Sequence, residues 1–519
     1  MKQVSSREAV DMIKDGSTVA WTTAGLCCFA EEVAMDLENK FLETGKPNKI
    51  TAVHSCGCGD GKTRGMSHLA HEGLVSRLIS GHTGQSKSMG QLISDNNIEA
   101  YLLPQGVMAH MWREIAGKKP GVITKVGLGT FVDPRMQGGK VSEKTKDDLV
   151  KLIELDGEEW LHYKTFPIDV AVIRATTADE NGNLTMDREG LLLEALPMAQ
   201  AAKNSGGIVI AQVEYIAKSN TLHPLQVKVP GVLVDYVVVA KPENHMQTIG
   251  TKFNPSFSGD LKIPIDSIKP LPLNERKIIA RRAAMELEEN TIINLGIGVP
   301  SGIANVATEE GIAEMITMTT ELGTYGGTPG GGEDFGVAYN PDAIIEHEAQ
   351  FDFYDGGGLD ATFLGLAQTD KEGNLNVSKF GSRVVGAGGF INISQNSKKV
   401  IFCGTFTAGA KYKIENGKIN IIQEGTTKKF VDKVEHVTFS GQYAKKINQT
   451  VIYITERAVF RLEDGVMTLT EIAPGIDIET DIIAAMEFTP KISPNIKEMP
   501  QELFEEKWNQ LGLILKNKK

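Results

Sequence analysis

A single carboxylate stands at the head of a glycine-rich run, and this part of the chain is the best suited to chemistry. Glu321 begins a twelve-residue stretch, residues 321–332, that holds six glycines. Glycines let a backbone turn tightly and let a ligand come close, so a large electrophile can reach the carboxylate. Carboxylates act as covalent nucleophiles toward activated acyl or phosphoryl groups. On its own, however, the run is more typical of a surface loop with a solvated glutamate.

Two shorter glycine turns offer backbone N–H groups that can hold an anion or an oxyanion. The first, residues 296–300, lies between an expected strand and an expected helix, and the second is residues 386–390. Exposed N–H groups at such turns bind negative charge. The candidates are Gly296, Gly298, Val299, Gly388 and Gly389. Either turn can equally be structural, and the first lacks the G-x-G-x-x-G spacing and the acidic residue of a dinucleotide-binding site.

Two other motifs fail the spacing that their chemistry needs. Residues 57–63 are close to a phosphate-binding loop, but the first glycine lies one residue too near the Gly-Lys-Thr end. Cys56 and Cys58, with His54, do not have the spacing of a zinc site, and no second pair follows. We therefore expect no metal. The five cysteines are an odd number in a large chain, which favours reduced thiols.

The size and charge of the chain exclude several classes of function. Its 519 residues predict two or more domains. A net charge of −12 argues against nucleic-acid binding, which needs a basic face. No apolar run approaches the roughly 18 residues of a membrane span, and the first residues lack an apolar signal core. We therefore expect a cytoplasmic protein with neither nucleic acid nor membrane as a partner.

Helical and strand patterns alternate along the chain, which indicates an α/β fold. Ser6 is expected to cap a helix that buries Val10 and Ile13 and stops at Gly16. Apolar, β-branched runs suit buried parallel strands. They predict strands at residues 208–213, 232–239 and 291–295, with a helix from residue 274 to about residue 289.

Two segments recur in the same order, which favours a tandem duplication of one α/β domain. The motif D-x-x-G-N-L occurs at Asp179 and again at Asp370, and a glycine follows each copy at the same distance. The strand, glycine turn and helix expected over residues 18–33 also recur over residues 291–306.

A proline-punctuated stretch without periodicity, residues 258–273, marks the expected boundary between the two copies. We therefore predict an N-terminal domain over residues 1–265 and a C-terminal domain over residues 274–519, the second carrying Glu321. Ligands of open α/β domains bind at the carboxyl ends of the strands. A duplicated pair places the site in the cleft between the domains.

Taken together, these segments resemble the class I coenzyme A transferases, in the acetate/propionate branch with both halves fused. The resemblance runs nearly end to end. Its motifs are residues 68–74, 103–107, 127–135, 296–298, the E-x-G-x-x-G element at Glu321, and residues 351–381. The resemblance implies two similar α/β domains, with coenzyme A as a substrate and no cofactor. It also favours a homo-oligomer, either a dimer or a tetramer.

The same resemblance implies a role for Glu321 as the nucleophile. The carboxylate attacks an acyl-CoA thioester and gives a glutamyl–acyl anhydride, which the CoA thiolate converts to an enzyme–CoA thioester. The oxyanion donors are expected near Gly298–Val299 and Gly388–Gly389, at about 3 kcal/mol each. The acyl pocket is expected to include Gln105, Leu322 and Gly323. In this branch the residue after the glutamate is usually small, so Leu322 is expected to affect acyl specificity. The same is expected of Cys56 and Cys58, because alanine and glutamine are usual at those positions.

The leading hypothesis is therefore a CoA-transferase for short carboxylates such as acetate, propionate, butyrate or lactate. One alternative is an acyl-CoA hydrolase on the same scaffold, in which water intercepts the glutamyl intermediate. Another is a non-enzymatic acyl-CoA-binding sensor. The intact Glu321 and its glycine run argue against the sensor, because a sensor does not need a nucleophile.

Overall fold

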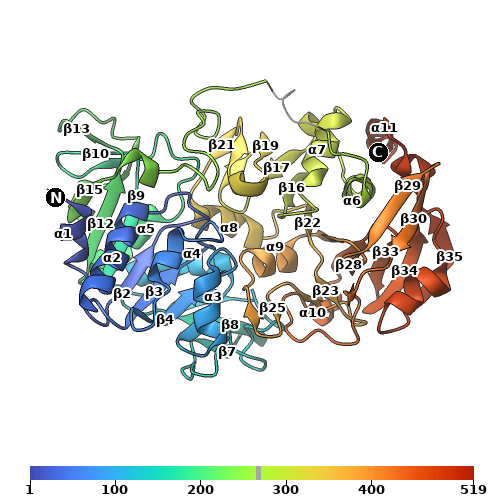
Figure 1. The fold of residues 1–519 in the computed structure, drawn as a ribbon, viewed down its shortest axis with the longest axis horizontal. Helices are drawn as coiled ribbons and strands as arrows, with labels where there is room; N and C mark the ends of the chain where they lie inside the picture. The colour runs from blue at the N-terminus through green and yellow to red at the C-terminus, as the bar shows by residue number, and fades with distance from the viewer. Residues whose placement is uncertain (265–269, 519) are drawn as a thin grey trace.

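The computed structural model describes residues 1–264 and 270–518, and each half of the chain surrounds a sheet of its own (Figure 1). The N-terminal half, residues 1–264, contains an eight-stranded sheet whose neighbouring strands all run parallel. In spatial order its strands are β1 (Lys2–Val4), β15 (Tyr236–Val239), β12 (Ile208–Val213), β9 (Val170–Arg174), β2 (Thr18–Trp21), β3 (Ile50–His54), β4 (Val75–Ser80) and β5 (Glu99–Leu102).

The C-terminal half, residues 270–518, contains a ten-stranded sheet with a parallel centre. The five central strands are β17 (Thr317–Thr319), β16 (Ile292–Leu295), β22 (Ala361–Gly365), β27 (Lys399–Cys403) and β32 (Thr450–Ile454). The outer strands are β21 (Ala343–Ile344) and β18 (Thr324–Tyr325) at one edge, and β33 (Ala458–Glu463), β34 (Val466–Ile472) and β35 (Lys491–Glu498) at the other.

The two sheets share one strand order, which confirms the expectation of two similar α/β units. The order β15-β12-β9-β2-β3 in the N-terminal half matches β32-β27-β22-β16-β17 in the C-terminal half. The match pairs β2 with β16, as the recurrence of residues 18–33 at 291–306 predicts. The expected domain boundary is not tested, since residues 265–269 lie outside the described part of the chain.

The D-x-x-G-N-L motif makes the same turn in both halves. The Oδ1 atom of Asp179 accepts hydrogen bonds from the backbone N–H groups of residues 181 and 183, at 2.9 Å each. The Oδ1 atom of Asp370 accepts from those of residues 372 and 374, at 3.1 and 3.0 Å. This shared turn follows β9 in one half and β22 in the other. The repeated motif is therefore a structural turn whose aspartate holds the backbone.

Helices flank both sheets (Figure 1). Those named below are α2 (Glu31–Thr44), α4 (Gln105–Ala116), α5 (Ala195–Asn204), α6 (Glu275–Ala284), α7 (Gly302–Glu309), α8 (His347–Asp355) and α9 (Phe390–Asn396). The helix predicted from residue 274 is confirmed as α6, where the side chain of Asn274 caps the first turn, but it ends at Ala284 and not near residue 289. The helix α4 packs against α5 in its own half and against α8 of the C-terminal half.

Two of the local predictions are wrong in detail. Ser5, not Ser6, caps the first helix, α1 (Ser6–Val10), because Ser5 and Glu8 form a reciprocal capping box. That helix ends at Val10 instead of running to Gly16, although Val10 and Ile13 are buried as expected.

The strand predicted at residues 232–239 begins only at Tyr236, the first residue of β15. The backbone at Gly231 is held by the D-x-x-G-N-L turn, since its N–H donates to Oδ1 of Asn183 at 2.9 Å. A short 3₁₀ turn, Gly231–Leu233, forms there instead and leaves Val232 exposed. The other apolar run, Ile208–Val213, is confirmed as β12.

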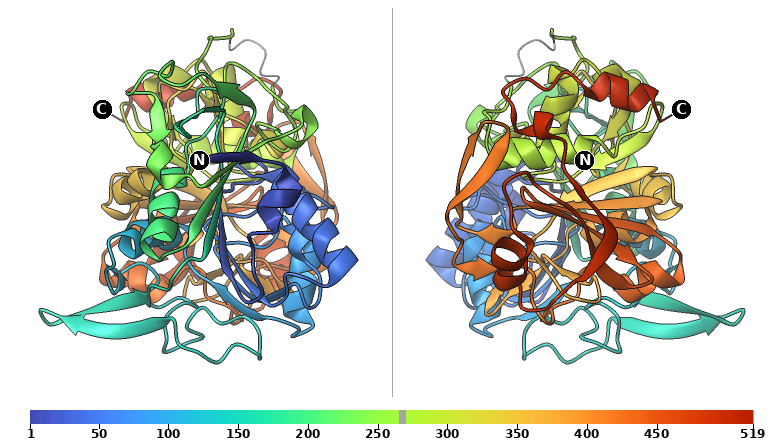
Figure 2. Two further views of the ribbon diagram at one scale, coloured as in Figure 1. Left: turned by 90° about the vertical axis from the view of Figure 1, so that its left-hand side faces the viewer. Right: turned by 90° about the vertical axis from the view of Figure 1, so that its right-hand side faces the viewer.

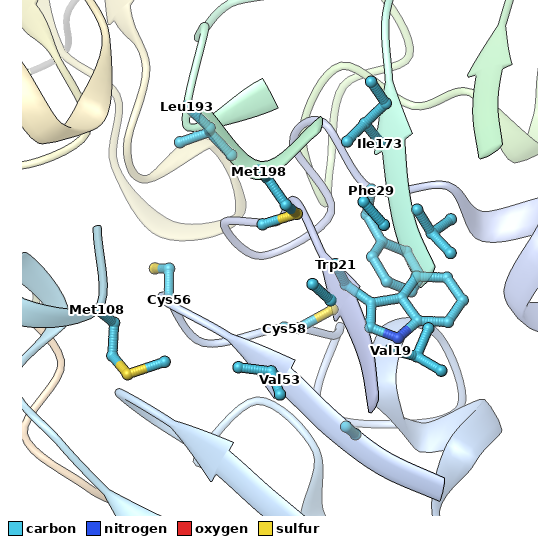
Figure 3. Close-up of a cluster of buried hydrophobic side chains, with 14 of the residues drawn as sticks. Val19, Trp21, Phe29, Val53, Cys56, Cys58, Met108, Ile173, Leu193 and Met198 are labelled. Carbon is cyan, nitrogen blue, oxygen red and sulfur yellow. The ribbon is translucent and has the colours of Figure 1, made fainter. Parts of the chain in front are cut away.

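A dense core holds the strands β2 and β3 of the N-terminal half in place (Figure 3). Trp21 and Phe29 are fully buried, with ring centroids 5.4 Å apart, and Val19 and Val53 pack in the same cluster. Each such side chain contributes about 1.5–3 kcal/mol by burial. The loops that carry Cys56 and the other residues after β2 and β3 are therefore anchored on rigid strands.

The five cysteines are unpaired and buried. Within residues 1–264 and 270–518, no helix is long and apolar enough to cross a membrane. A hairpin of β7 (Val150–Leu155) and β8 (Glu158–Lys164), joined by β6 (Gly121–Thr124), projects away from the body of the molecule (Figure 2).

Candidate active site

A cavity of about 240 Å³ lies between the two halves at the carboxyl ends of their parallel strands. The N-terminal half lines it with Ala24, Gly25, Cys56, Gly57, His82, Gln85 and Gln105. The C-terminal half adds residues from the loops after β16, β17 and β22 and from residues 386–390. The two halves also hydrogen-bond here, because Gln105 N–H donates to Gly388 C=O at 3.0 Å. The cavity therefore needs both halves.

Glu321 follows the short strand β17 and lines this cavity, with part of its side chain still accessible. The loop that carries it is held by Thr320, whose hydroxyl donates to Gly336 C=O at 2.9 Å. A Cβ atom at Gly389 would lie 2.6 Å from Oε2 of Glu321. A side chain at position 389 would therefore displace the carboxylate, so a glycine is needed there.

The pKa of Glu321 is raised, because burial penalises the charged carboxylate. Interactions with His347 and with the side chain of Gln105 oppose this and lower the pKa in part. The carboxylate is thus poorly solvated but still contacted by polar groups. A nucleophile in this state gives up little hydration when it attacks.

Gln105 is the first residue of α4, and its side chain is almost completely buried. Its Nε2 atom lies 3.0 Å from Nε2 of His347. The other ring nitrogen of His347, Nδ1, lies 2.7 Å from Oε1 of Glu194. A continuous row of polar side chains therefore runs from Glu321 through Gln105 and His347 to Glu194.

Sequence reasoning missed His347 and Glu194. His347 lies 242 residues from Gln105 in the sequence, and Glu194 lies 153 residues from His347, so no local spacing connects them. It also missed His82 and Gln85, which line the cavity near Gly57. Burial lowers the pKa of His82 to about 4, so its imidazole is neutral near pH 7.

The glycine amides expected to donate to an oxyanion differ in their availability. The N–H of Gly296 donates to Phe363 C=O at 2.8 Å, and that of Gly388 donates to Gly81 C=O at 2.9 Å. Both are used within the fold, so neither can serve as a donor in this arrangement. No backbone hydrogen bond among the described residues engages the N–H of Gly389, which borders the carboxylate of Glu321.

The remaining predicted residues divide between the cavity and its surroundings. Leu322 lines the cavity and packs into the core of the N-terminal half. Gly323 does not line it, and a Cβ there would lie 2.2 Å from Ile345 C=O, so its role is to let the backbone pass. Gly298 has a φ of +87° and faces open space. Val299 lines a neighbouring cavity instead.

That second cavity, of about 250 Å³, shares Gly365 and Val377 with the first. Arg276 and Lys429 stand in its wall. Burial lowers the pKa of Lys429, and the positive charge of Arg276 lowers it further against the pull of Glu456. A second positive charge beside Lys429 favours the binding of an anion at this wall of the cavity. No three-residue cluster among the described His, Cys, Asp and Glu side chains is arranged to hold a metal ion.

Comparison with known proteins defines the class. The sequence profile of the coenzyme A transferase family matches residues 4–240. The chain is 52% identical to a caffeate CoA-transferase of Acetobacterium woodii over 99% of both chains. It is 46% identical to the acetate CoA-transferase YdiF of Escherichia coli K12 over 96% of this chain and 94% of that one.

The fold agrees with these sequence matches. The crystal structure of the acyl-CoA transferase YdiF apoenzyme from Escherichia coli O157:H7 superposes with a TM-score of 0.93 at 45% identity, covering 98% of this chain and 96% of that one. A structure of YdiF as a thioester complex with CoA superposes with a TM-score of 0.92 at 44% identity, covering 97% and 96%. The chain therefore belongs to the coenzyme A transferase family, and it is an enzyme that transfers coenzyme A.

Proposed function

We propose that this enzyme transfers coenzyme A between short-chain acyl-CoAs and carboxylates through a glutamyl-CoA thioester on Glu321. The observation that carries the proposal is the position of this carboxylate in the cavity between the halves, beside a glycine that leaves it room. The YdiF relative, named as an acetate CoA-transferase and crystallised as a thioester complex with CoA, supports the same chemistry.

The proposed reaction begins when an Oε atom of Glu321 attacks the thioester carbonyl carbon. The C–S bond breaks, CoA leaves as the thiolate, and a glutamyl–acyl anhydride remains. The thiolate then attacks the glutamyl carbonyl carbon, the C–O bond of the anhydride breaks, and the free carboxylate departs. An acceptor carboxylate runs both steps in reverse. Because each step exchanges one activated carbonyl for another, the transfer needs no nucleotide hydrolysis.

The tetrahedral intermediates of both steps carry an oxyanion, and two groups beside Glu321 can stabilise it. These are the side-chain amide of Gln105, which lines the same cavity, and the N–H of Gly389. A donor of this kind contributes about 3 kcal/mol to the transition state. This reading gives Gln105 a role in the chemical step, beyond that of a polar wall of the acyl pocket.

The second cavity suits the long arm of coenzyme A. It opens from the first at Gly365 and Val377, and Arg276 and Lys429 supply positive charge for phosphate groups. Contacts far from the reacting carbon can supply binding energy that is realised in the transition state. On the opposite side, Cys56 and Leu322 narrow the acyl end of the first cavity, which favours short acids.

Initial-rate kinetics tests this proposal. With propionyl-CoA varied at several fixed acetate concentrations, a covalent enzyme–CoA intermediate gives parallel double-reciprocal lines. Intersecting lines would show that both substrates must be bound together, and release of CoA that does not depend on acetate would show hydrolysis. Chain-length profiles for the acceptor, from acetate to longer and hydroxylated acids, then define the substrate range.

The proposal includes a cytoplasmic homo-oligomer, a dimer or a tetramer. The projecting β7–β8 hairpin supports a contact between copies, because Leu155 on it and Ile123 beside it are each more than 40% exposed. Exposed apolar side chains on an extended arm are typical of interaction surfaces. Light scattering coupled to gel filtration measures the mass directly, and a monomer would contradict this part of the proposal.

A further inference from the structure

We propose that His347 and Glu194 are positioning residues that determine which end of the Gln105 side-chain amide faces Glu321. The inference rests on the proposed role of Glu321 as the nucleophile. An amide has a donating end and an accepting end of similar shape. Only the donating end stabilises a carboxylate or an oxyanion.

The three residues meet at the starts of three helices. Gln105 is the first residue of α4, His347 is the first residue of α8, and Glu194 directly precedes α5. Each of these side chains is at most 1% exposed. The N–H of His347 also donates to Leu193 C=O at 3.4 Å, which ties the start of α8 to the segment that carries Glu194. Water therefore cannot substitute for the side-chain contacts.

The contact between Glu194 and His347 selects one form of the imidazole. Oε1 of Glu194 lies 2.7 Å from Nδ1 of His347, and a carboxylate only accepts hydrogen bonds. Nδ1 therefore carries a hydrogen, and in the neutral ring Nε2 presents a lone pair. The ring is held in place by Phe351, whose centroid lies 5.1 Å away.

The lone pair on Nε2 of His347 then selects one orientation of the Gln105 amide. Nε2 of Gln105, at 3.0 Å, donates one of its two hydrogens to it. The second hydrogen of the same NH₂ group is available to the carboxylate of Glu321, which lines the same cavity as Gln105. In the reversed amide, Oε1 would face the lone pair of the ring and the negative charge of Glu321, and both contacts would be repulsive.

A merely structural role for the buried Glu194–His347 contact gives a different expectation. That contact joins the two halves of the chain, so its loss would lower stability whatever stood at position 105. The positioning role requires that His347 act through Gln105. A double-mutant cycle separates the two roles, because residues that act through each other are not additive.

The central variant is His347→Asn, since the asparagine amide can still donate to Glu194 but presents nothing to Gln105. We expect kcat for propionyl-CoA and acetate to fall about tenfold or more, with KM for propionyl-CoA within about twofold of wild type. In a Gln105→Ala background the same substitution should change kcat by less than about twofold. His347→Gln, whose carbonyl can reach toward the position of Nε2, should recover part of the loss.

Glu194→Gln is the second variant and keeps the shape of the side chain. Its NH₂ group can donate to Nδ1 of His347, which places the ring hydrogen on Nε2 and reverses the Gln105 amide. The wrong tautomer is known to disable a histidine whose carboxylate partner becomes an amide. We expect kcat to fall about tenfold or more here too, again only when Gln105 is present.

Four results would overturn the inference: wild-type kcat in His347→Asn, wild-type kcat in Glu194→Gln, wild-type kcat in Gln105→Ala, or multiplicative losses in the double mutants. Circular dichroism and urea denaturation check that each variant is folded. If His347→Asn does not fold, the cycle is carried out with Glu194→Gln and Gln105→Ala. Parallel-line kinetics of the wild-type enzyme is established first. Its absence would refute the proposed function, and the positioning role with it, whereas parallel lines with multiplicative losses in the double mutants would refute the positioning role alone.

Discussion

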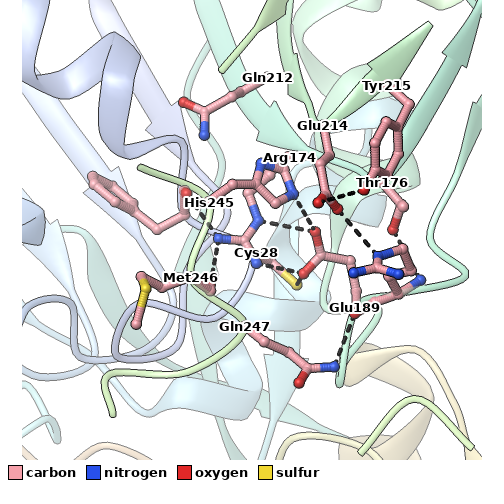
Figure 4. Close-up of polar contacts among 12 residues, drawn as sticks. Cys28, Arg174, Thr176, Glu189, Gln212, Glu214, Tyr215, His245, Met246 and Gln247 are labelled. Carbon is pink, nitrogen blue, oxygen red and sulfur yellow. Dashed lines mark hydrogen bonds and ion pairs between the residues drawn. The ribbon is translucent and has the colours of Figure 1, made fainter. Parts of the chain in front are cut away.

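The two halves use equivalent strand ends in opposite ways. In the N-terminal half, β9 ends at Arg174, whose Nε donates to Glu189 at 2.9 Å, and both side chains are almost fully buried (Figure 4). In the C-terminal half the equivalent strand, β22, ends at Gly365, which lines the open second cavity. One copy of the duplicated domain therefore has a buried ion pair in the wall of a cavity of about 160 Å³, where the other has a larger cavity of about 250 Å³ without such a pair.

The next pair of equivalent strands shows the same contrast. Cys56 lies two residues beyond the end of β3, and Glu321 lies two residues beyond the end of β17. Both line the cavity between the halves. Burial raises the pKa of the Cys56 thiol far above its usual value, and the negative charge of Glu321 raises it further. The thiol is therefore not a nucleophile near pH 7, whereas the carboxylate is ionisable.

The two copies of the duplicated domain therefore have different roles in catalysis and in stability. The C-terminal half supplies the carboxylate, the open second cavity and the glycine beside the nucleophile. The N-terminal half supplies the wall of the acyl end and Gln105, and uses Arg174 and Glu189 for stability. Substitutions at equivalent positions in the two halves should therefore have unequal effects.

The largest expected effect is at the paired positions 321 and 56. Glu321→Gln should reduce transferase activity by about a thousandfold or more, because it removes the nucleophile and keeps the shape. Cys56→Ser, at the equivalent position of the other half, should cost only a few-fold. Steady-state rates with propionyl-CoA and acetate measure both. Comparable losses of activity in the two variants would contradict the unequal roles of positions 321 and 56.

The second expected effect concerns the ion pair of the N-terminal half. Glu189→Gln leaves Arg174 buried without its partner and should lower the free energy of unfolding by about 3–5 kcal/mol. The rate per folded enzyme should change little. Glu180→Gln, which removes an exposed partner of Lys218, is the matched control and should leave stability nearly unchanged. Urea denaturation measures both variants.

The same ion pair predicts how stability depends on pH. Burial alone would raise the pKa of Glu189, but Arg174 and His245 outweigh it and lower the pKa to about 2. The folded-state pKa is depressed, so this contribution is present above pH 4.5, the ordinary value for a glutamate, and is lost as the pH falls toward 2. Glu189→Gln should flatten the stability profile in that window. An unaltered profile would show that the pair does not contribute.

The third expected effect is at Gly389. Gly389→Ala puts a methyl group 2.6 Å from Oε2 of Glu321 and should lower kcat about a hundredfold while the protein stays folded. Gly331→Ala is the control, since a Cβ there meets nothing within 4 Å and the backbone is unstrained. Full activity of Gly389→Ala would show that the carboxylate works from another position.

The smallest expected effect is on selectivity. Leu322→Ala removes apolar bulk from the acyl end and should raise kcat/KM for longer acids by a few-fold, about what one or two methylenes are worth in such a pocket. Acetate should be affected less. Competition between acetate and hexanoate measures the ratio. An unchanged ratio would place Leu322 outside the acyl site.

Much of the fold was accessible from the sequence because its signals are local. The apolar run at residues 208–213 and the cap at Asn274 both predict what forms there. The strand predicted at residues 232–239 was partly wrong because Gly231 is bound by a turn about fifty residues away, which overrides the propensity of the run. The repeated D-x-x-G-N-L motif predicted that the domain is duplicated, and the shared strand order of the two sheets confirms two similar domains.

The candidate site could be predicted from the sequence only where the type of a residue indicates its chemistry. A carboxylate in a glycine run is such a signal, and it led to Glu321. Which backbone N–H groups are free to donate could not be predicted from the sequence. Gly388 and Gly389 are adjacent, but only the N–H of Gly388 is hydrogen-bonded to Gly81 C=O. The row from Gln105 to His347 joins residues 242 positions apart, and only the folded chain reveals it.

Mass spectrometry of the enzyme after addition of propionyl-CoA, without an acceptor, shows whether Glu321 becomes covalently bound to CoA. We expect a CoA adduct on the peptide that carries Glu321, discharged when acetate is added and absent from Glu321→Gln. Steady release of free CoA with no adduct on that peptide, or an adduct on Cys56, would contradict this expectation.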